Sequence, residues 1–301
     1  MKKEIFYIGL GKMGINMATR LVQKDWRVIG YDTSESVRKE GEKIGIIPVE
    51  TIANGVELLS SGSRLIWMMV PYTKVDDVLT DLIKNIRSGD IIIDGGNSPF
   101  QESIRRHKEL KEKGIYYIDA GVSGGPEGAK NGACVMVGGE KNIFEKCEEL
   151  FQDISAMNAY KFFGPSGAGH FVKMVHNGIE YGMMQSIAEG FTLMKQSPFD
   201  LNLCDVADLY NHKSVVESRL IGWLKKGMEY YGENLENISG EVSHSGEGQW
   251  TVDIAKSWDV SVKNIEQSLD FRKQSQGNPS YTGKVLTAMR NAFGGHSIGK
   301  E

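Results

Sequence analysis

A stripe of reactive side chains lies in an otherwise apolar stretch of the chain. Its members stand at positions i, i+4, i+7 and i+8, which fall on one face of an α-helix: Lys173, Asn177, Glu180 and Tyr181. His176 flanks this face, four residues before Glu180. An amine and a carboxyl on one face can take up and return protons, and burying them without polar partners would be costly. The stripe therefore indicates acid–base chemistry, with a solvated helix face as the alternative.

A glycine pattern near the N-terminus predicts a dinucleotide site. The run Gly9-Leu10-Gly11-Lys12-Met13-Gly14 matches G-x-G-x-x-G and stands between a predicted strand and a predicted helix. Asp32 ends the next predicted strand, where a carboxylate accepts a hydrogen bond from a ribose 2′-hydroxyl and repels a 2′-phosphate. We expect Arg38 on the solvated face of the following helix. The pattern predicts NAD rather than NADP, with a turn used only for packing as the alternative.

Two further glycine-containing loops follow predicted buried strands. They are Asp94-Gly95-Gly96-Asn97-Ser98 and Gly121-Val122-Ser123-Gly124-Gly125. Ligands of doubly wound sheets bind beyond the carboxyl ends of the strands, and adjacent glycines let backbone N–H groups reach an anion. Each loop, taken alone, is equally consistent with ordinary turn chemistry.

The elements that must hold these groups alternate between strands and helices in the first half of the chain. Apolar runs predict strands at 4–8, 27–31, 65–70, 91–94, 116–119, 134–137 and 160–163. Amphipathic segments predict helices at 13–23, 73–84, 98–113 and 143–151. The third helix has a start signal, with Ser98 as N-cap, Pro99 at N1 and Gln101 completing a capping box. This order predicts an α/β fold with a mostly parallel, doubly wound, Rossmann-like sheet.

The pattern changes after Gly164, where strand-like runs almost disappear. Helices are expected at 169–195, 202–211, 215–231, 256–274 and 281–293. We therefore expect a dinucleotide-binding Rossmann domain over residues 1–165 and an all-α domain for substrate binding and dimerisation over residues 166–301.

Composition excludes several classes of protein. Lys+Arg 35 against Asp+Glu 39 gives a net charge of −4, and without a basic tract the chain is a poor nucleic-acid binder. The longest apolar runs are too short to span a bilayer, and no signal peptide is apparent, so no membrane is expected. The cysteines Cys134, Cys147 and Cys204 are few and scattered, which fits the reducing cytoplasm. No cluster has metal-ligand spacing, so no metal is predicted.

Over essentially its whole length the sequence resembles the decarboxylating 6-phosphogluconate dehydrogenases. The resemblance is carried by the loops at 94–98 and 121–125 and by Lys173-Met174-Val175-His176-Asn177-Gly178-Ile179-Glu180-Tyr181-Gly182. The segment Arg290-Asn291-Ala292-Phe293-Gly294-Gly295-His296 is similar to the family's C-terminal substrate-binding tail. The length resembles the short bacterial form, which tends to use NAD. Related β-hydroxyacid dehydrogenases share the fold and the lysine, but not the acid and tyrosine pattern.

The resemblance implies that NAD-dependent oxidation of 6-phospho-D-gluconate is followed by loss of carbon dioxide. Lys173, as a neutral amine, would take the proton of the C3 hydroxyl, and Glu180, as a neutral acid, would return a proton to the product. Substrate contacts are implied for Asn97, Ser123, Gly124, Gly125, His176, Asn177, Tyr181, Arg272, Arg290 and His296. Cofactor contacts are implied for Gly9, Leu10, Gly11, Lys12, Met13, Gly14, Asp32, Val70 and Asn97. A homodimer or homotetramer is implied, with the tail completing a neighbouring active site.

One departure from the family pattern bears on the substrate. In Ser245-Gly246-Glu247-Gly248-Gln249, Ser245 and Glu247 replace the lysine and threonine that the long form offers to the substrate phosphate. A glutamate beside a phosphate is unfavourable, so phosphate binding would fall on Tyr181, Arg272 and Arg290, or Glu247 points elsewhere. Two alternatives remain open. One is a β-hydroxyacid dehydrogenase that acts on a small unphosphorylated acid, and the other is a non-catalytic NAD-binding sensor.

Overall fold

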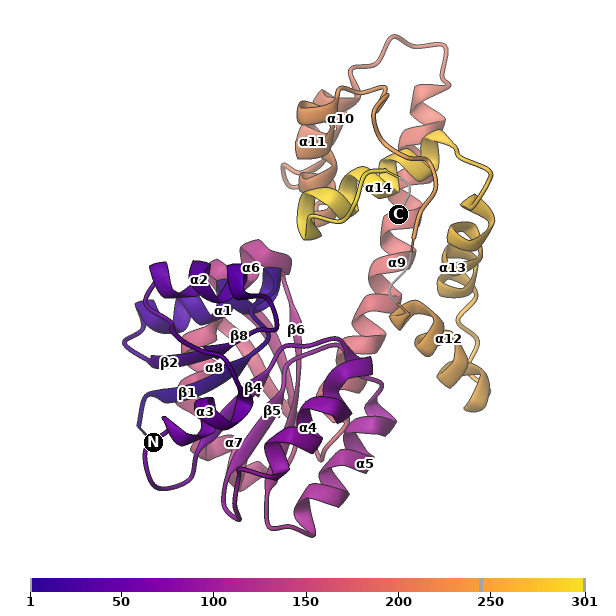
Figure 1. Cartoon of the computed structure of the whole chain (residues 1–301). Coiled ribbons are helices and arrows are strands. Elements are labelled where there is room, and N and C mark those ends of the chain that lie inside the picture. The colour runs from indigo at the N-terminus through magenta and orange to yellow at the C-terminus, as the bar shows by residue number, and fades with distance from the viewer. Residues whose placement is uncertain (1, 244–245, 300–301) are drawn as a thin grey trace. The chain divides into compact units, whose positions relative to one another are not determined.

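Eight strands form one sheet in the order β3-β2-β1-β4-β5-β6-β7-β8, as seen in the computed structural model of Figure 1. The structure describes residues 2–243 and 246–299. The strands are β1 (Glu4–Ile8), β2 (Arg27–Tyr31), β3 (Ile47–Val49), β4 (Leu65–Met68), β5 (Ile91–Asp94), β6 (Tyr116–Ser123), β7 (Ala133–Gly138) and β8 (Ser155–Gly164). Strands β1 to β6 all run parallel to one another. Strand β7 is antiparallel to β6 and parallel to β8. The expected α/β, Rossmann-like sheet is confirmed.

Helices cover both faces of this sheet, which is why its central strands are apolar on both sides. One face packs against α1 (Lys12–Gln23), α6 (Gly125–Asn131), α7 (Lys141–Lys146) and α8 (Glu148–Ile154), through side chains such as Tyr7, Trp67 and Phe151. The other face packs against α3 (Ile52–Glu57), α4 (Val75–Ile83) and α5 (Phe100–Lys111), through Phe6, Met68 and Leu79 among others. Helix α2 (Glu35–Lys43) follows β2, and the 3-10 turn η1 (Tyr72–Lys74) precedes α4.

The chain forms two compact units, which divide inside helix α9 (Ala168–Lys195), between residues 174 and 175. The second unit is helical, with α10 (Leu203–Tyr210), α11 (Arg219–Tyr231), α12 (Glu247–Ser257), α13 (Lys263–Ser275) and α14 (Tyr281–Gly294). Its core gathers Met184 and Phe191 of α9, Leu224 of α11 and Leu286 of α14. The assignment of separate cofactor and substrate domains divided after residue 165 stays a prediction.

Several predicted elements differ from the structure. The helix expected at 256–274 is two helices, because residues 258–262 between α12 and α13 are not helical. The segment 143–151 is divided between α7 and α8, strand β3 was missed, and β8 begins five residues before the predicted strand at 160–163. The predicted capping box is wrong. Pro99 takes the N-cap position of α5, and the Ser98 hydroxyl donates to Asp94 instead.

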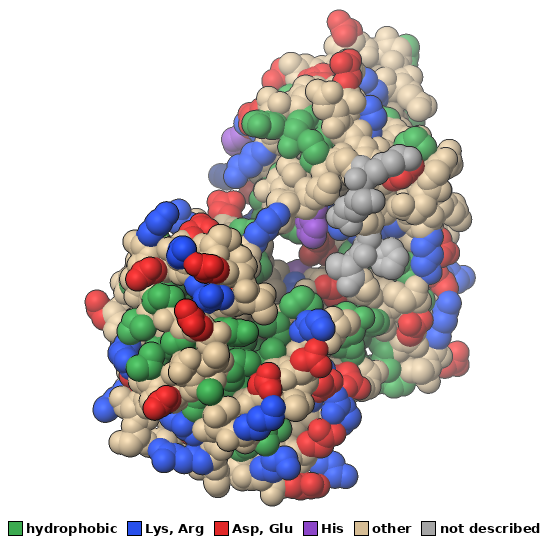
Figure 2. Space-filling view, viewed as in Figure 1, with side chains coloured by type: hydrophobic (Ala, Val, Ile, Leu, Met, Phe, Trp, Pro, Cys, Tyr) green, Lys and Arg blue, Asp and Glu red, His purple; other side chains and the backbone are tan. Residues whose placement is uncertain are grey.

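The described surface has no extended field of one charge on the face seen in Figure 2, where Lys and Arg side chains alternate with Asp and Glu over the first unit. Within residues 2–243 and 246–299, every helix is too short or too polar to cross a membrane.

Candidate active site

The glycine loop after β1 has the geometry that a dinucleotide requires. Gly9 has φ +92°, and Gly14 lies so close to the Gly9 carbonyl that a side chain at residue 14 would overlap it. Gly11 is the N-cap of α1 and makes no side-chain cap, and a Cβ on Gly11 would meet no atom within 4 Å. The first backbone N–H groups of the helix belong to Lys12, Met13 and Gly14. The open space at the positive end of a helix fits a pyrophosphate group.

Asp32, just after β2, is tied to this loop. Its Oδ2 accepts a hydrogen bond from the Leu10 N–H at 2.8 Å, and its Oδ1 accepts from the Ser34 N–H at 2.9 Å. The Leu10 side chain is buried in the core, so any cofactor contact from this residue comes from its backbone. The expectation that Arg38 lies on a solvated face was wrong. Arg38 is half-buried, and its Nη1 donates to the Asp32 carbonyl at 2.7 Å.

The loops after β4 and β5 lie beside the glycine loop, at the point where the strand order reverses between β1 and β4. A Cβ on Gly9 would stand 3.0 Å from Cγ1 of Val70, and a Cβ on Gly96 would stand 2.7 Å from the Val70 carbonyl oxygen. Asn97 follows Gly96 and is exposed. The structure thus brings together Val70, Asn97 and the glycine loop, as the sequence predicts for the cofactor site.

Helix α9 is docked onto the sheet through a buried carboxylate, that of Asp119 in β6. The Asp119 carboxylate accepts hydrogen bonds from the backbone N–H of Gly167 at 2.7 Å and of His170 at 2.9 Å. A Cβ on Gly169 would stand 2.6 Å from the Asp119 carbonyl oxygen, so this first turn packs directly on β6. Sequence analysis did not assign this role to Asp119. The available signal was an acidic residue at the end of a buried apolar run.

This docking fixes the position of Lys173 in the first unit. The helix runs along β6 toward the strand's carboxyl end, from Gly169 beside Asp119 to Lys173 beside Gly121. A Cβ on Gly121 would overlap the Cβ of Lys173, so only glycine permits the approach. Lys173 is 7% exposed. Burial of an amine disfavours its charged form and so favours the neutral amine, which is the form that a general base needs.

The end of β6 forms a tight turn beyond Lys173. Gly124 and Gly125 have φ values of +119° and +62°, which favour glycine, and they lead into α6, where Pro126 occupies the first turn. Ser123 is half-buried at the end of the strand. Hydroxyl and amide donors of this turn are suited to a carboxylate.

In the second unit, the remaining polar residues of α9 contact one another. His176 Nδ1 lies 3.0 Å from Asn177 Oδ1 and 3.9 Å from Glu180 Oε2. Asn177 is buried, while the side chain of Glu180 is 23% exposed. Because α9 is one continuous helix, Lys173, Asn177, Glu180 and Tyr181 occupy the predicted single face.

Tyr181 packs in a buried cluster with Arg272, near which both cationic and anionic side chains lie. The guanidinium of Arg272 stacks 3.5 Å above the Tyr181 ring centroid, and Gly248 of α12 packs so tightly on the ring that a Cβ there would come within 2.5 Å of it. Burial, followed by the charge of Arg290, lowers the pKa of Arg272 to about 10, while Tyr181, Glu180 and Glu247 act in the opposite direction. Arg272 therefore remains a cation at neutral pH.

Glu247, at the start of α12, is 3% exposed and lies within the electrostatic reach of Arg272. Its carboxylate is therefore not in solvent, and Ser245, the other replaced position, lies outside the described residues. A buried carboxylate near Arg272 offsets part of the charge that a phosphate would meet.

The segment expected to act as a tail begins inside the last helix. Arg290 lies within α14, is 6% exposed and donates from Nη1 to the Ser243 hydroxyl at 2.9 Å. The His296 ring packs edge-on against Phe293 at a centroid distance of 5.8 Å, and the His296 carbonyl accepts from Asn291. In this structure the segment folds back on its own unit.

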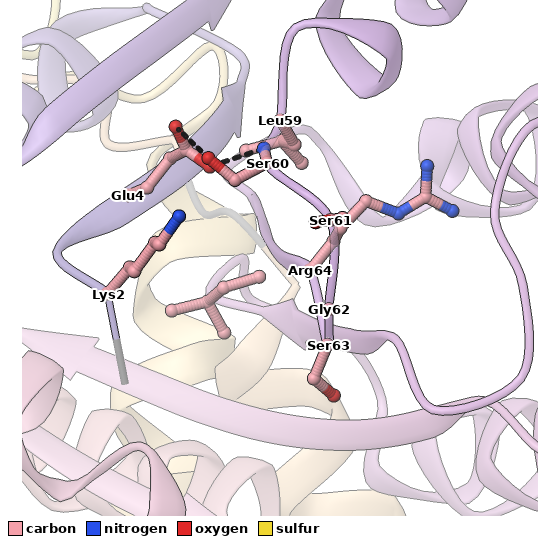
Figure 3. A pocket seen from close by; sticks show the side chains of 9 residues that line it. Lys2, Glu4, Leu59, Ser60, Ser61, Gly62, Ser63 and Arg64 are labelled. Carbon is pink, nitrogen blue, oxygen red and sulfur yellow. Dashed lines mark hydrogen bonds between the residues drawn. The ribbon is translucent and has the colours of Figure 1, made fainter.

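Two other features bear on alternative sites. A pocket lined by Lys2, Glu4 and residues 59–65 lies at the amino ends of β1 and β4, where Ser60 donates to the Glu4 carboxylate (Figure 3). Ligands of doubly wound sheets bind at the opposite, carboxyl edge, so we assign it no role. Over the described ranges, no group of three or more His, Cys, Asp or Glu side chains is placed to hold a metal ion.

Comparisons with known proteins agree with this arrangement. A family model described as the NAD binding domain of 6-phosphogluconate dehydrogenase matches residues 4–164, and a model of the 6-phosphogluconate dehydrogenase C-terminal domain matches residues 169–282. The chain is 43% identical over 298 residues to the "Putative 6-phosphogluconate dehydrogenase YqeC" of Bacillus subtilis, covering 99% of this chain and 100% of that protein. It is 34% identical to the NAD(+)-dependent, decarboxylating 6-phosphogluconate dehydrogenase of Haloferax volcanii, covering 98% of each.

Solved structures give the same fold. The 6-phosphogluconate dehydrogenase of Plasmodium falciparum, solved with NADP+ and with 6-phosphogluconate, superimposes with a TM-score of 0.81 at 30% identity. The match covers 90% of this chain and 62% of that longer protein. A 3-hydroxyisobutyrate dehydrogenase of Mycobacterium tuberculosis has a TM-score of 0.74 at 18% identity, covering 95% and 99% of the two chains, which shows likeness of fold alone. The family models and the full-length relatives establish that the chain belongs to the 6-phosphogluconate dehydrogenase family of oxidoreductases.

Proposed function

We propose that this protein oxidises 6-phospho-D-gluconate with NAD and releases D-ribulose 5-phosphate and carbon dioxide. The observation that carries the proposal is the buried Lys173, held beside Gly121 near the carboxyl end of β6 and followed on the same helix by Asn177, Glu180 and Tyr181. A buried amine and a carboxyl on one helix face supply the base and the acid that the two half-reactions need.

The glycine loop and Asp32 would hold the cofactor. The loop amides at the start of α1 fit the pyrophosphate, and the Asp32 carboxylate, anchored by Leu10 and Ser34, would accept from a ribose 2′-hydroxyl. When bound, the nicotinamide supplies an acceptor for a hydride. The carboxylate favours NAD, and the full-length relative from Haloferax volcanii is named as NAD(+)-dependent. Val70 and Asn97 would contact the nicotinamide side of the cofactor.

In the oxidation, the Lys173 amine takes the proton of the C3 hydroxyl as C3 loses its hydrogen with the bonding electron pair. The product is a β-keto acid. The Lys173 ammonium then returns its proton to the C3 oxygen as the bond between C1 and C2 breaks, so that carbon dioxide leaves and an enediol forms. Protonated Glu180 gives its proton to the carbon that becomes C1 of ribulose 5-phosphate, while the Lys173 amine takes back the proton of the enediol oxygen, which becomes the ketone. The turnover ends with Lys173 protonated and Glu180 ionised, so one proton passes from the amine to the carboxyl, by way of solvent, before the next cycle.

Other side chains would orient the substrate. Ser123 and the amides of Gly124 and Gly125 would bind the carboxylate, while Asn97, His176 and Asn177 would bind hydroxyls. Tyr181, Arg272 and Arg290 would bind the phosphate. The stacked, buried guanidinium of Arg272 is fixed in orientation before a ligand arrives, which reduces the entropy cost of binding.

We further propose a homodimer or homotetramer in the cytoplasm, acting in the pentose phosphate pathway and in gluconate utilisation. In the dimer, the segment around His296 would leave Phe293 and complete a neighbouring active site. An active monomer in light scattering at assay concentration would contradict this part of the proposal.

A β-hydroxyacid dehydrogenase acting on a small unphosphorylated acid is the second candidate, and Glu247 is the observation that favours it. A buried carboxylate near Arg272 and Tyr181 weakens the attraction for a phosphate dianion. The test compares NAD reduction with 6-phosphogluconate, gluconate and 3-hydroxyisobutyrate. The proposal predicts the highest kcat/KM for 6-phosphogluconate, and a preference for either unphosphorylated acid would overturn it.

A further inference from the structure

A buried polar network lies directly beneath the loop that carries Asn97. Asp94, the last residue of β5, is fully buried, and its two carboxylate oxygens hold that loop from both sides. Oδ1 accepts from the Gly96 N–H at 3.1 Å, and Oδ2 accepts from the Ser98 hydroxyl at 2.9 Å. Asn97 stands between these two anchored residues, so its position depends on the Asp94 carboxylate.

Asp94 has two further partners, Tyr117 and Arg106. The Tyr117 hydroxyl donates to Oδ2 at 2.9 Å, and Arg106 Nη1 lies 3.6 Å from the same oxygen. Burial, followed by the charge of Asp94, raises the pKa of Tyr117 well above its ordinary value, so this hydroxyl stays protonated and donates. Arg106 is therefore the cation that compensates a buried anion.

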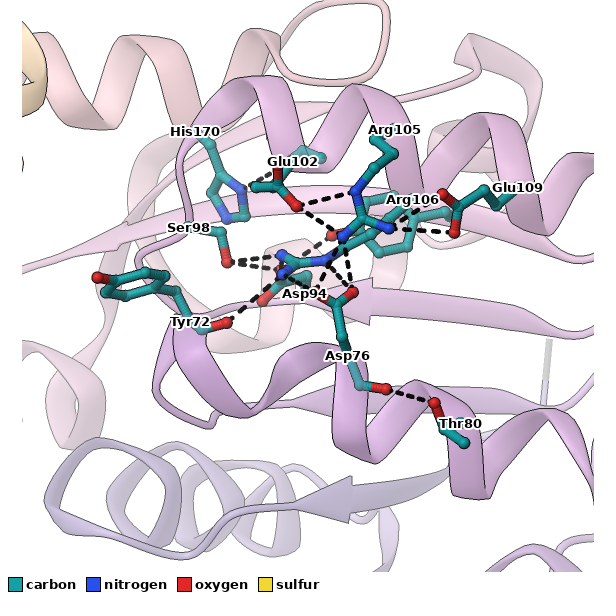
Figure 4. A network of polar contacts seen from close by, with 12 residues as sticks. Tyr72, Asp76, Thr80, Asp94, Ser98, Glu102, Arg105, Arg106, Glu109 and His170 are labelled. Atoms are coloured by element: carbon teal, nitrogen blue, oxygen red, sulfur yellow. Dashed lines mark hydrogen bonds and ion pairs between the residues drawn. The ribbon is translucent and has the colours of Figure 1, made fainter. Parts of the chain in front are cut away.

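Arg106 also reaches the loop after β4, as Figure 4 shows. Its Nε and Nη2 bond the two carboxylate oxygens of Asp76, at the start of α4, at 2.9 and 3.1 Å. Its Nη2 donates to the Tyr72 carbonyl at 3.4 Å, and its Nη1 donates to the Ser98 hydroxyl at 3.3 Å. One guanidinium, 2% exposed, thus connects the loop that follows Val70 with the loop that carries Asn97.

We propose that Arg106 is a positioning residue for cofactor binding, which sets the loop at 95–98 against the loop after β4 and so fixes Asn97. The inference rests on the proposed cofactor role of Asn97. A planar guanidinium can hold Asp76, Ser98 and Asp94 at once, whereas an ammonium cannot match that geometry.

The adjacent residue provides a matched control. Arg105 also bonds Asp76, at 2.9 Å, but its other partners are the carboxylates of Glu102 and Glu109 on its own helix. It is 40% exposed and makes no bond to Asp94, Ser98 or Tyr72 among the described contacts. Changing Arg105 therefore removes a similar number of ion pairs without releasing the loop.

The test is direct titration of NADH, followed by its fluorescence, into the full-length wild-type, Arg106→Lys and Arg105→Lys proteins. We expect Arg106→Lys to raise the Kd for NADH about tenfold, the loss of roughly one charge-assisted bond. Arg105→Lys should stay within about twofold, as for an exposed ion pair. An unchanged Kd in a folded Arg106→Lys protein would overturn the proposal.

A double-mutant cycle separates positioning from general stability. In an Asn97→Ala background, Arg106→Lys should change the Kd for NADH by less than about threefold, because the residue it positions is gone. A full effect in that background would contradict the proposal. If Arg106→Lys does not fold, Asp76→Asn replaces it, since this weakens the hold of the guanidinium on α4. The bond of Asp76 to Arg105 is weakened as well, and Arg105→Lys measures that contribution separately. We expect a smaller rise in the Kd for NADH than in Arg106→Lys. An unchanged Kd would overturn the proposal.

These results do not depend on the substrate. A wild-type protein that binds NADH but does not oxidise 6-phosphogluconate contradicts the proposed function and leaves the inference about Arg106 standing. Normal turnover of 6-phosphogluconate together with an unaltered Kd in Arg106→Lys contradicts the inference alone.

Discussion

Gly121 and Lys173 are packed so closely that the hydrogen of the glycine is the only side chain that fits between β6 and helix α9. This contact fixes the first two carbons of the Lys173 side chain against β6, two residues beyond Asp119 toward the carboxyl end of the strand. The start of the side chain is therefore set by the sheet, which restricts where the amine can lie, as a base acting on one hydroxyl requires.

Gly121→Ala should lower kcat by about 100-fold, because a displacement of the order of an ångström moves a base out of reach of its proton. Overpacking should also destabilise the fold by about 1–3 kcal/mol. Steady-state kinetics and thermal unfolding measure the two effects. The control is Gly190→Ala on the same helix, where a Cβ meets no atom within 4 Å and activity should be retained. Full activity in Gly121→Ala would show that the contact does not position the amine.

Lys173→Met should reduce oxidation by about 10³-fold or more, within the range for loss of a general base and oxyanion donor together. Glu180→Gln should reduce the rate of hydride transfer less than Lys173→Met does. Its main effect should be to slow the final protonation. Single-turnover formation of NADH, compared with formation of ribulose 5-phosphate, separates the two steps. If both variants slow NADH formation equally, the division of roles between the amine and the carboxyl is wrong.

Asp32→Ser should reduce the preference for NAD over NADP by about tenfold or more, since it removes a charge that repels the 2′-phosphate. Arg38 donates to the backbone carbonyl of residue 32, which the substitution keeps, so its guanidinium stays beside the altered side chain as a candidate partner for that phosphate. The measurement is kcat/KM for each cofactor. Asp32→Ser combined with Arg38→Gln should lose the gained NADP activity, and its persistence would exclude Arg38 as the phosphate partner.

Glu247→Gln should raise kcat/KM for 6-phosphogluconate by about threefold to tenfold, because a buried anion near the phosphate site becomes neutral. Kcat/KM for gluconate should change little. Glu236→Gln makes the same charge change at an exposed position of the second unit and serves as the control. A loss of activity toward the phosphorylated acid alone would mean that Glu247 supports the substrate, through Arg272, rather than opposing it.

The buried network around Arg106 predicts a pH dependence of stability. A hydrogen bond from Arg106, partly offset by burial and joined by Arg105, lowers the pKa of Asp76 from its ordinary value of 3.8 to about 2. Since the folded-state pKa is the lower one, the stabilisation is complete above about pH 5 and is lost as the pH falls toward 2. The effect is moderated by the partial exposure of Asp76.

This dependence is tested by thermal unfolding of the wild type and Asp76→Asn between pH 3 and pH 6. In this window Asp76 begins to protonate in the unfolded chain. The wild type should be more stable at the upper end, and the difference should shrink toward the lower end. Asp77 is the next residue of α4 and pairs with the exposed Lys74 at 3.1 Å, so Asp77→Asn should show little difference throughout. A difference that grows as the pH falls would contradict the assignment.

The sequence was sufficient for the elements in which local pattern and tertiary environment agree. Apolar runs predicted β1, β2 and β5 to the residue, because both faces of these central strands are covered. The glycine loop and the stripe on α9 were also predictable, since their spacing is set by a turn and by the helical period.

Long-range pairing was not predictable. Ser98 has the local signal of an N-cap, but a buried carboxylate at Asp94 takes its hydroxyl, and the cation that balances Asp94 comes from the next helix. Arg290 lies in a predicted helix, but the sequence does not show that the packing of α14 buries it against Ser243. For Ser98 the energy of satisfying a buried polar group exceeds the weak local preference, and in both cases only the folded structure identifies the partner.

The most direct test of the account measures NADH and trapped carbon dioxide together, from 6-phosphogluconate in the wild type and in Lys173→Met. We predict equimolar NADH and carbon dioxide in the wild type and neither product above background in the variant. NADH without carbon dioxide, no reaction with 6-phosphogluconate, or wild-type turnover by Lys173→Met would contradict the proposed function.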